Sequence, residues 1–347
     1  MTGRVLVARM DNVGDVLLAG PCIRAVAAHA ESVTLLAGPR GRAGADLLPG
    51  VDRVLTWCAP WIDPEPPAVT ATGIDAFVAE LRGLRFDRAL ILTSFHQSPL
   101  PLALVLRMAG VRWIGAISED YPGSLLDLRH RVSGDPPEAE RALSLAAAAG
   151  FRLPPGDDGR LAVRGPLPDV GHLTGDPGYV VVHPAASVPA RQLSTARSAA
   201  VVAALADAGY RVLVTGAAAD RPCTGRVAGD RARDLGGTTT LPELAAVLRD
   251  ASVVVAPNTG PAHLAAAVGT PVVSLFAPVV PAARWAPYGV PVAILGDQEA
   301  PCRDSRAREC PIPGHPCLES VSPDDVVLAV KELSAGGCAG LQTGGVS

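Results

Sequence analysis

Lysine is almost absent from this sequence of 347 residues. Lys331 is the only one, so nearly all of the 30 positive charges are arginines. Aromatic residues make up only 4%, so any core has to be built from Val, Leu, Ile and Ala. The formal net charge is -4 and no long basic run occurs, which argues against a nucleic-acid-binding protein. The arginine bias and the abundant alanine are typical of a GC-rich bacterial genome.

Long apolar runs and secretion signals are also missing. No uncharged apolar stretch approaches the roughly 18–20 residues that a membrane span requires. The first residues, Met1-Thr2-Gly3-Arg4, lead directly into a strand-like segment and lack the pattern of a signal peptide. Seven cysteines at irregular spacing do not form a secreted disulfide framework. We therefore expect a cytoplasmic protein with at most peripheral contact at the inner face of a membrane.

Short runs of β-branched residues alternate with longer helical patterns, which is typical of a parallel α/β sheet. Continuous apolar runs such as Ala89–Leu92 fit strands that are covered on both faces. In the first half, the predicted strands are Arg4–Ala8, Val33–Leu36, Arg53–Thr56, Arg88–Leu92 and Val111–Gly115. The predicted helices between them include Val16–Ala30, Ile74–Gly83 and Pro101–Ala109.

A second series of the same kind follows a Pro- and Gly-rich stretch at residues 165–178. Its predicted strands are Tyr179–His183, Arg211–Thr215, Ser252–Ala256, Pro271–Ser274 and Val290–Ile294. Its predicted helices are Thr195–Ala208, Leu241–Arg249, Pro261–Val268 and Pro323–Leu333. The patterns predict two Rossmann-like domains, residues 1–165 and 166–335, with a flexible tail at 336–347. Open α/β sheets bind ligands at the carboxyl ends of their strands, so chemistry is expected in a cleft between the domains.

The segment Arg9–Val16, between the first predicted strand and the first helix, contains a candidate catalytic carboxylate. It is not a dinucleotide-binding fingerprint, because only Gly14 is present where three glycines would be needed. Instead it places Asp15 beside a flexible glycine at the carboxyl end of a strand. Alternatively, Asp15 only stabilises the helix as an acidic residue in its first turn. The residues themselves leave both interpretations open.

The segment His183–Arg191 follows the first strand of the second domain. Its small residues allow backbone N–H groups to approach a phosphate, Ser187 adds a hydroxyl donor, and Arg191 offers a bidentate cation. The alternative is an ordinary proline-containing loop between a strand and a helix.

The segment Pro257–Leu264 is again a strand end that opens into a helix. Asn258 or Thr259 can cap this helix, and Pro261 suits its first turn. Amides at such an end bind a negative diphosphate. His263 on its own is more typical of a partly buried structural histidine. Two anion-suited loops at adjacent strand ends nevertheless favour a diphosphate site.

Taken together, these motifs resemble glycosyltransferase family 9, the heptosyltransferases that use ADP-heptose. The resemblance is carried by Arg9, Gly14, Asp15 and Pro21, by His183-Pro184 with Ser187 and Arg191, and by Asn258–Ala267 continued in Gly269–Phe276. It covers the chain up to about Leu333, and the C-terminal segment is its most specific part. The resemblance implies the GT-B fold, in which two Rossmann-like domains with parallel sheets face each other across a cleft.

The resemblance also implies a role for each candidate residue. Asp15 would be the general base that deprotonates the acceptor hydroxyl, with Arg9 and Gly14 on the acceptor side. Asp220 would hold the nucleotide ribose, and Thr239 would lie beside the base. The rest of the donor site would consist of Ser187, Arg191, Asn258, Thr259, Gly260, Pro261 and His263.

At Asn258 many family members carry Asp, so this chain has an amide that both donates and accepts in place of an acceptor-only carboxylate.

No metal or other cofactor is expected, because the D-x-D motif that commonly holds a metal–diphosphate complex is missing. Arg191 and helix N-termini would then have to neutralise the leaving diphosphate. The alternative is a zinc site formed by Cys302, Cys310, Cys317 and His315, although the spacing lacks a C-x₂₋₄-C pair.

The resemblance implies an inverting, metal-independent glycosyltransferase of lipopolysaccharide-type biosynthesis. It would transfer a sugar, a heptose from ADP-heptose in the first instance, to a hydroxyl of a cell-envelope glycan or a natural product. The expected partners are therefore a nucleotide-diphosphate sugar and a glycan or small-molecule acceptor. Two alternatives stay open: a nucleotide-sugar 2-epimerase of the same fold, and a non-catalytic nucleotide-sugar-binding protein. A dehydrogenase is disfavoured, because neither half has a glycine-rich fingerprint.

Overall fold

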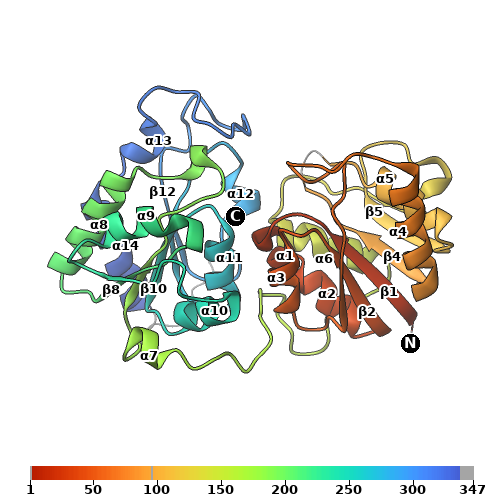
Figure 1. Ribbon diagram of the computed structural model, residues 1–347, viewed down its shortest axis with the longest axis horizontal. Helices are drawn as coiled ribbons and strands as arrows, with labels where there is room; N and C mark the ends of the chain where they lie inside the picture. The colour runs from red at the N-terminus through yellow and green to blue at the C-terminus, as the bar shows by residue number, and fades with distance from the viewer. Residues whose placement is uncertain (1, 95–96, 337–347) are drawn as a thin grey trace. The chain divides into compact units, whose positions relative to one another are not determined.

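The computed structural model describes residues 2–94 and 97–336 of the chain. The chain divides into two compact units after Gly165, and each unit contains one six-stranded sheet (Figure 1). The predicted α/β class with two parallel sheets is therefore confirmed. The predicted flexible tail lies outside the described residues from position 337 onward.

The sheet of the first unit has the strand order β3-β2-β1-β4-β5-β6, and all of its strands are parallel. Its strands are β1 (Thr2–Arg9), β2 (Ala30–Ala37), β3 (Arg53–Thr56), β4 (Arg88–Ile91), β5 (Trp113–Ile117) and β6 (Leu128–His130). The chain order reverses between β1 and β4. In open α/β sheets ligands bind at this reversal, just beyond the carboxyl ends of the two strands.

Helices of the first unit connect these strands and cover the sheet. They are α1 (Val13–Leu18), α2 (Gly20–Ala27), α3 (Arg42–Asp46), α4 (Ala71–Leu84), α5 (Leu100–Met108) and α6 (Glu138–Ala148), with a 3₁₀ turn η1 (Gly123–Leu125).

The prediction of one helix over Val16–Ala30 was wrong, because the structure has two helices that meet at Ala19 and Gly20. Pro21 lies in the first turn of α2, where its missing N–H group is tolerated, but inside a continuous helix it would remove a hydrogen bond.

The second unit repeats the topology with the order β12-β11-β10-β7-β8-β9, again parallel throughout. Its strands are β7 (Val180–Val182), β8 (Val212–Val214), β9 (Arg233–Asp234), β10 (Val253–Pro257), β11 (Val272–Leu275) and β12 (Val292–Leu295). Here the chain order reverses between β7 and β10. The loops after these two strands are the ones that the sequence selected as anion-binding segments.

Helices of the second unit include α8 (Thr195–Asp207), α9 (Arg221–Ala228), α10 (Leu241–Arg249), α11 (Gly260–Ala267) and α14 (Pro323–Gly336). Shorter elements are α7 (Gly171–Thr174), α12 (Ala282–Trp285), α13 (Pro316–Glu319), η2 (Pro189–Arg191) and η3 (Ala218–Asp220). None of the helices in the described part of the chain is long and apolar enough to cross a bilayer.

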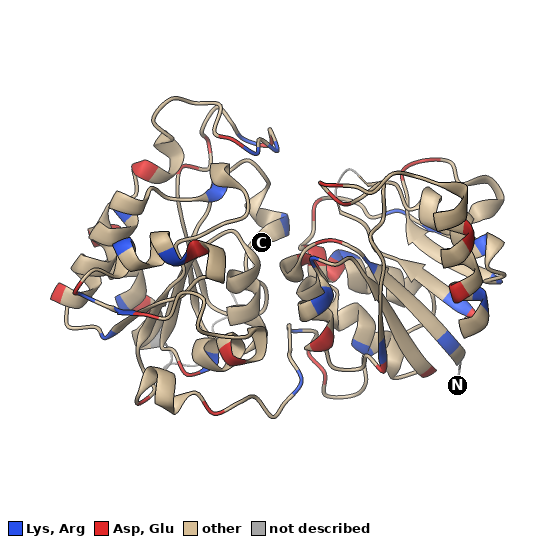
Figure 2. Cartoon of the chain, in the orientation of Figure 1, with Lys and Arg blue, Asp and Glu red and all other residues tan. Residues whose placement is uncertain are grey.

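Valine and alanine supply most of the core, as the scarcity of aromatic residues requires. In β10, Val253, Val254 and Val255 are all completely buried, although successive side chains point to opposite faces of a sheet. Both faces of the sheet are therefore covered, as the continuous apolar runs predicted. Charged residues of both signs are spread over each unit (Figure 2).

Candidate functional site

In the first unit, one buried guanidinium contacts three carboxylates at the carboxyl end of β1. Arg9, the last residue of β1, is only 1% exposed. Its Nη1 lies 2.8 Å from Oε1 of Glu138, its Nε 2.9 Å from Oδ2 of Asp11, and its Nη2 3.2 Å from Oδ1 of Asp15. The predicted base Asp15 is therefore tied to the predicted acceptor-side residue Arg9.

Separate elements place these groups around Arg9. Asp11 lies in the loop after β1, Asp15 in the first turn of α1 behind the buried Gly14, and Glu138 at the first position of α6. The loop after β4 adds two polar contacts, because Oγ of Ser94 accepts a hydrogen bond from Arg9 Nη2 at 3.0 Å. Nε2 of Gln97 donates to Oδ1 of Asp11 at 2.5 Å. The cluster thus lies where the order of the sheet reverses.

Burial and mutual charge set the protonation of this cluster. Burial alone would lower the pKa of Arg9, but Asp11, Glu138 and Asp15 together raise it above its usual range, so Arg9 stays cationic. Burial raises the pKa of Asp11, and the charge of Asp15 raises it further, against the opposing effect of Arg9. The cluster has more acids than bases, and Asp11 is the carboxyl whose pKa is raised.

In the second unit, His183 lies directly after β7 and is 7% exposed. Its Nδ1 is hydrogen-bonded to Oγ1 of Thr215, just after β8, at 3.0 Å. Burial lowers the pKa of His183 to about 4, although the nearby Asp220 opposes the shift. The imidazole is therefore neutral at physiological pH. Asp220 itself accepts a hydrogen bond from the backbone N–H of Ala217 at 2.8 Å.

The start of α11 has buried polar atoms that lack a hydrogen-bond partner within the described residues. Nδ2 of Asn258 and Nδ1 of His263 are both such atoms, in side chains only 3% and 4% exposed. Leaving a buried polar group unpaired costs about 1–3 kcal/mol, so each of these atoms calls for a partner, which a ligand or a water molecule can supply.

Thr259, one of the two residues predicted to cap α11, is its N-cap residue. No side chain makes a capping hydrogen bond there, however, so the side-chain cap itself does not form. The backbone of Thr259 is extended, with φ -153° and ψ 173°. Pro261 has no N–H group, and the N–H of Ala262 donates to the carbonyl of Thr259 at 3.1 Å, which leaves the N–H of Gly260 for an anion. Gly260 and Pro261 form the first turn and are partly exposed.

Arg191 belongs to the segment after β7, and its charge acts on His263 in α11, the helix that follows β10. It is the last residue of η2, half-buried, and close enough to His263 to lower its pKa. Burial is the larger cause, and together they bring the pKa of His263 to about 4. Ser187 is exposed in the same loop, whereas Thr239 is half-buried in the loop before α10. The roles of Ser187 and Thr239 stay predictions.

The cysteines of the C-terminal loop approach one another without forming a metal site. Burial raises the pKa of Cys317 to about 12, and the proximity of Cys302 and Cys310 adds to this shift. Nε2 of His315, however, is hydrogen-bonded to the carbonyl of Ala190 at 3.1 Å. Within residues 2–94 and 97–336, no three His, Cys, Asp or Glu side chains are arranged to hold a metal ion.

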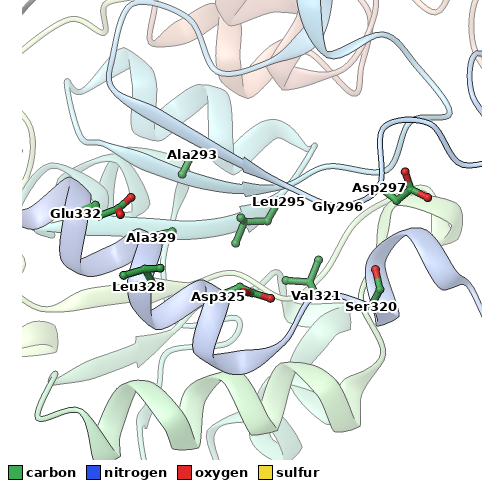
Figure 3. A pocket seen from close by; sticks show the side chains of 10 residues that line it. All are labelled: Ala293, Leu295, Gly296, Asp297, Ser320, Val321, Asp325, Leu328, Ala329 and Glu332. Atoms are coloured by element: carbon green, nitrogen blue, oxygen red, sulfur yellow. The ribbon is translucent and has the colours of Figure 1, made fainter.

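A cavity of about 410 Å³ lies between the edge strand β12 and α14 (Figure 3). Its lining includes Leu295, Leu328 and the carboxylates of Asp297, Asp325 and Glu332. None of the predicted site residues lines it. A pocket with an acidic rim is unsuited to a diphosphate, so we do not assign the donor site to it.

Glu138 and the loop residues Ser94 and Gln97 were missed by the sequence interpretation. Glu138 follows two prolines at a helix start, where an acidic residue is common for its interaction with the helix dipole. Its contact with Arg9 spans 129 positions of the chain. Asp11 belongs to the motif around Asp15 and could have been found there.

Two parallel α/β sheets, each with polar loops where the strand order reverses, define a protein of two α/β units with the GT-B fold. The family model described as glycosyltransferase family 9 (heptosyltransferase) matches residues 74–315. The chain belongs to this family. The predicted family resemblance is confirmed.

Among curated proteins, the chain is 31% identical over 174 residues to lipopolysaccharide heptosyltransferase 3 of Escherichia coli. This alignment covers 48% of the chain and 49% of the relative, so the chain spans about half the length of that curated protein.

Two solved structures share the fold. The ADP-heptose lps heptosyltransferase II of E. coli superposes with a TM-score of 0.73 at 20% identity, over 97% of this chain and 100% of that one. A family 9 glycosyl transferase from Veillonella parvula DSM 2008 superposes with a TM-score of 0.77 at 16% identity, over 96% of this chain and 97% of that one.

Proposed function

We propose that the chain is an inverting glycosyltransferase that transfers a sugar from an ADP-sugar, ADP-heptose in the first instance, to an acceptor hydroxyl. Membership of family 9 supports the class of reaction. The observation that carries the donor assignment is the start of α11, where buried polar atoms of Asn258 and His263 lack partners at a helix end without a side-chain cap. The preference for ADP-heptose is supported by the name of the E. coli heptosyltransferase with the same fold.

In this proposal the second unit holds the donor. The N–H of Gly260 at the start of α11 and the guanidinium of Arg191 face the diphosphate and stabilise the negative charge that develops as it leaves. His263 contributes a neutral ring nitrogen, because its pKa of about 4 keeps it unprotonated. Asp220, close to His183, is the ribose-binding carboxylate. With these groups the reaction would need no metal ion.

The first unit supplies the general base. Asp15 removes the proton of the acceptor hydroxyl while the bond between the anomeric carbon and the diphosphate breaks. Attack from the face opposite the leaving group inverts the anomeric centre. Arg9 holds Asp15 through the 3.2 Å contact and so fixes the direction from which the carboxylate meets the acceptor. The acceptor is a cell-envelope glycan, such as a lipopolysaccharide core, or a small natural product, and the enzyme acts in the cytoplasm.

The test separates this proposal from its two rivals. The protein is incubated with ADP-heptose, GDP-mannose or UDP-glucose, with and without a lipopolysaccharide core oligosaccharide, and released nucleotide is quantified. Release that depends on the acceptor supports a transferase. Release without an acceptor indicates an epimerase, and binding without any release indicates a non-catalytic nucleotide-sugar-binding protein.

A further inference from the structure

We propose that Glu138 is a positioning residue for Asp15. It holds the guanidinium of Arg9 so that the shortest contacts of this cation go to other carboxylates and Asp15 stays available as a base. The inference rests on the proposed function, in which Asp15 accepts the acceptor's proton.

Of the three contacts that Arg9 makes with carboxylates, the one with the proposed base Asp15 is the longest. The shortest, at 2.8 Å, joins Nη1 to Glu138, and the longest, at 3.2 Å, joins Nη2 to Asp15. Nη2 is also shared, because it donates to Oγ of Ser94 at 3.0 Å. A carboxylate that receives a close bidentate contact from arginine is a poor base, since the pair stabilises its charged form. The observed arrangement avoids such a contact at Asp15.

Glu138 is itself fixed from several sides. It is 3% exposed, and its position at the start of α6 places it at the positive end of the helix dipole. While Oε1 contacts Arg9, Oε2 lies 4.0 Å from Nε of Arg141. A buried carboxylate held by two cations and a helix terminus has little freedom to move. Arg9 therefore has a rigid partner at Nη1, while a different nitrogen, Nη2, contacts Asp15.

Removal of Glu138 changes what Arg9 can do. The guanidinium then faces Asp11 and Asp15 alone, and nothing on the α6 side competes for its Nη1 group. A closer contact with Asp15 and the loss of one negative charge both stabilise the ionised form of the remaining carboxylates. Asp15 would then point less well at the acceptor hydroxyl and would bind its proton less tightly. The charged groups involved are Arg9, Asp11, Asp15, Glu138 and Arg141.

The test compares Glu138→Gln and Glu138→Ala with a control on the same helix turn. Glu140→Gln is the control, because Glu140 is an exposed acid in the first turn of α6, so its loss removes the same helix-start charge. For each protein, kcat and kcat/KM are measured against pH with ADP-heptose and a lipopolysaccharide core oligosaccharide, together with the melting temperature. Asp15→Asn and the double variant Asp15→Asn/Glu138→Ala complete the set.

We expect Glu138→Ala to lower kcat by about 10- to 100-fold, the size of effect that small misplacement of a reacting group produces, with donor KM unchanged. Glu138→Gln should recover part of this loss, because its amide oxygen can still accept from Arg9. In both variants the acidic limb of the pH–rate profile should move to lower pH, whereas Glu140→Gln leaves kcat and the profile as they are. The double variant should be no slower than Asp15→Asn.

A merely structural role would change the melting temperature but leave the pH profile of the remaining activity in place. That result, or additive losses in the double variant, would overturn the inference while leaving the proposed function intact. If Asp15→Asn is itself as active as the unmodified protein, the base assignment fails and the role of Glu138 fails with it. The Gln variant keeps the test decisive if Glu138→Ala does not fold.

Discussion

At the scale of single residues, Asp15 carries the largest expected effect. Replacement by Asn keeps the size of the side chain but removes its ability to take a proton. We expect turnover to fall by at least ~10²-fold, the lower range for a positioned general base, with donor affinity almost unchanged. Single-turnover kinetics with ADP-heptose and a lipopolysaccharide core oligosaccharide measure the chemical step directly. If Asp15→Asn turns over as fast as the unmodified protein under these conditions, the carboxylate is only a helix-start residue.

Arg191 should act on the diphosphate and not on the acceptor. A guanidinium can bridge two phosphate oxygens, and the charge it stabilises grows as the diphosphate leaves. Arg191→Ala should therefore raise donor KM and lower kcat, and Arg191→Lys should restore only part of both, because the planar fork is lost.

Steady-state kinetics with the donor varied at saturating acceptor would measure these effects. Arg226→Ala, a change in the last turn of α9, is a matched control for loss of one arginine from the second unit. Unchanged donor kinetics in Arg191→Ala would remove Arg191 from the site and weaken the phosphate-binding interpretation of residues 183–191.

At the scale of elements, the loop after β7 and the first turns of α11 each contain a buried histidine whose protonation is unfavourable in the fold. The pKa values of His183 and His263 are lowered to about 4 from 6.5. Between these values the unfolded chain binds more protons than the folded one, so stability falls as pH decreases from about 6.5 to 4. Above pH 6.5 both histidines are neutral in the folded and the unfolded chain, so they no longer destabilise the fold.

We therefore expect the melting temperature of the protein to decrease between pH 6.5 and 4, and the decrease to be smaller in His263→Asn. Differential scanning calorimetry across this range checks the prediction. An identical pH dependence in His263→Asn and the unmodified protein would show that His263 does not titrate with a lowered pKa.

Several elements could be predicted from the sequence because their signals are local. The helix Leu241–Arg249 was predicted with its observed bounds, and a reciprocal capping pair, Thr240 and Glu243, marks its start. The strand Arg53–Thr56 was also predicted correctly. In contrast, β9 consists of Arg233 and Asp234, two exposed charged residues, so no apolar pattern indicates a strand there. It forms because its backbone pairs with β8.

In the candidate site, too, only contacts between residues close in the sequence could be predicted. Arg9 and Asp15 are six positions apart, and one motif contains both. Glu138 reaches Arg9 only because α6 returns to the carboxyl end of β1, which is a consequence of the tertiary fold. Similarly, unpaired polar atoms such as Nδ2 of Asn258 become visible only once burial and hydrogen bonds are known.

At the scale of the whole molecule, catalysis should not require a metal ion. The uncapped start of α11 and Arg191 can neutralise the diphosphate in place of a divalent cation. We expect full activity in excess EDTA. Activity that EDTA abolishes and Mg²⁺ or Mn²⁺ restores would indicate a metal-bound diphosphate. Restoration by Zn²⁺ alone would instead indicate a site at Cys302, Cys310 and Cys317.

Transfer of a sugar from an ADP-sugar to an acceptor hydroxyl is the activity that we propose for the chain. The most direct test incubates the protein with ADP-heptose and a lipopolysaccharide core oligosaccharide and follows both products, ADP by chromatography and the glycan by mass spectrometry. We expect one heptose added to the glycan for each ADP released, with an anomeric configuration opposite to that of the donor. Release of ADP without any addition of sugar to the acceptor, or retention of the donor's configuration, would contradict it.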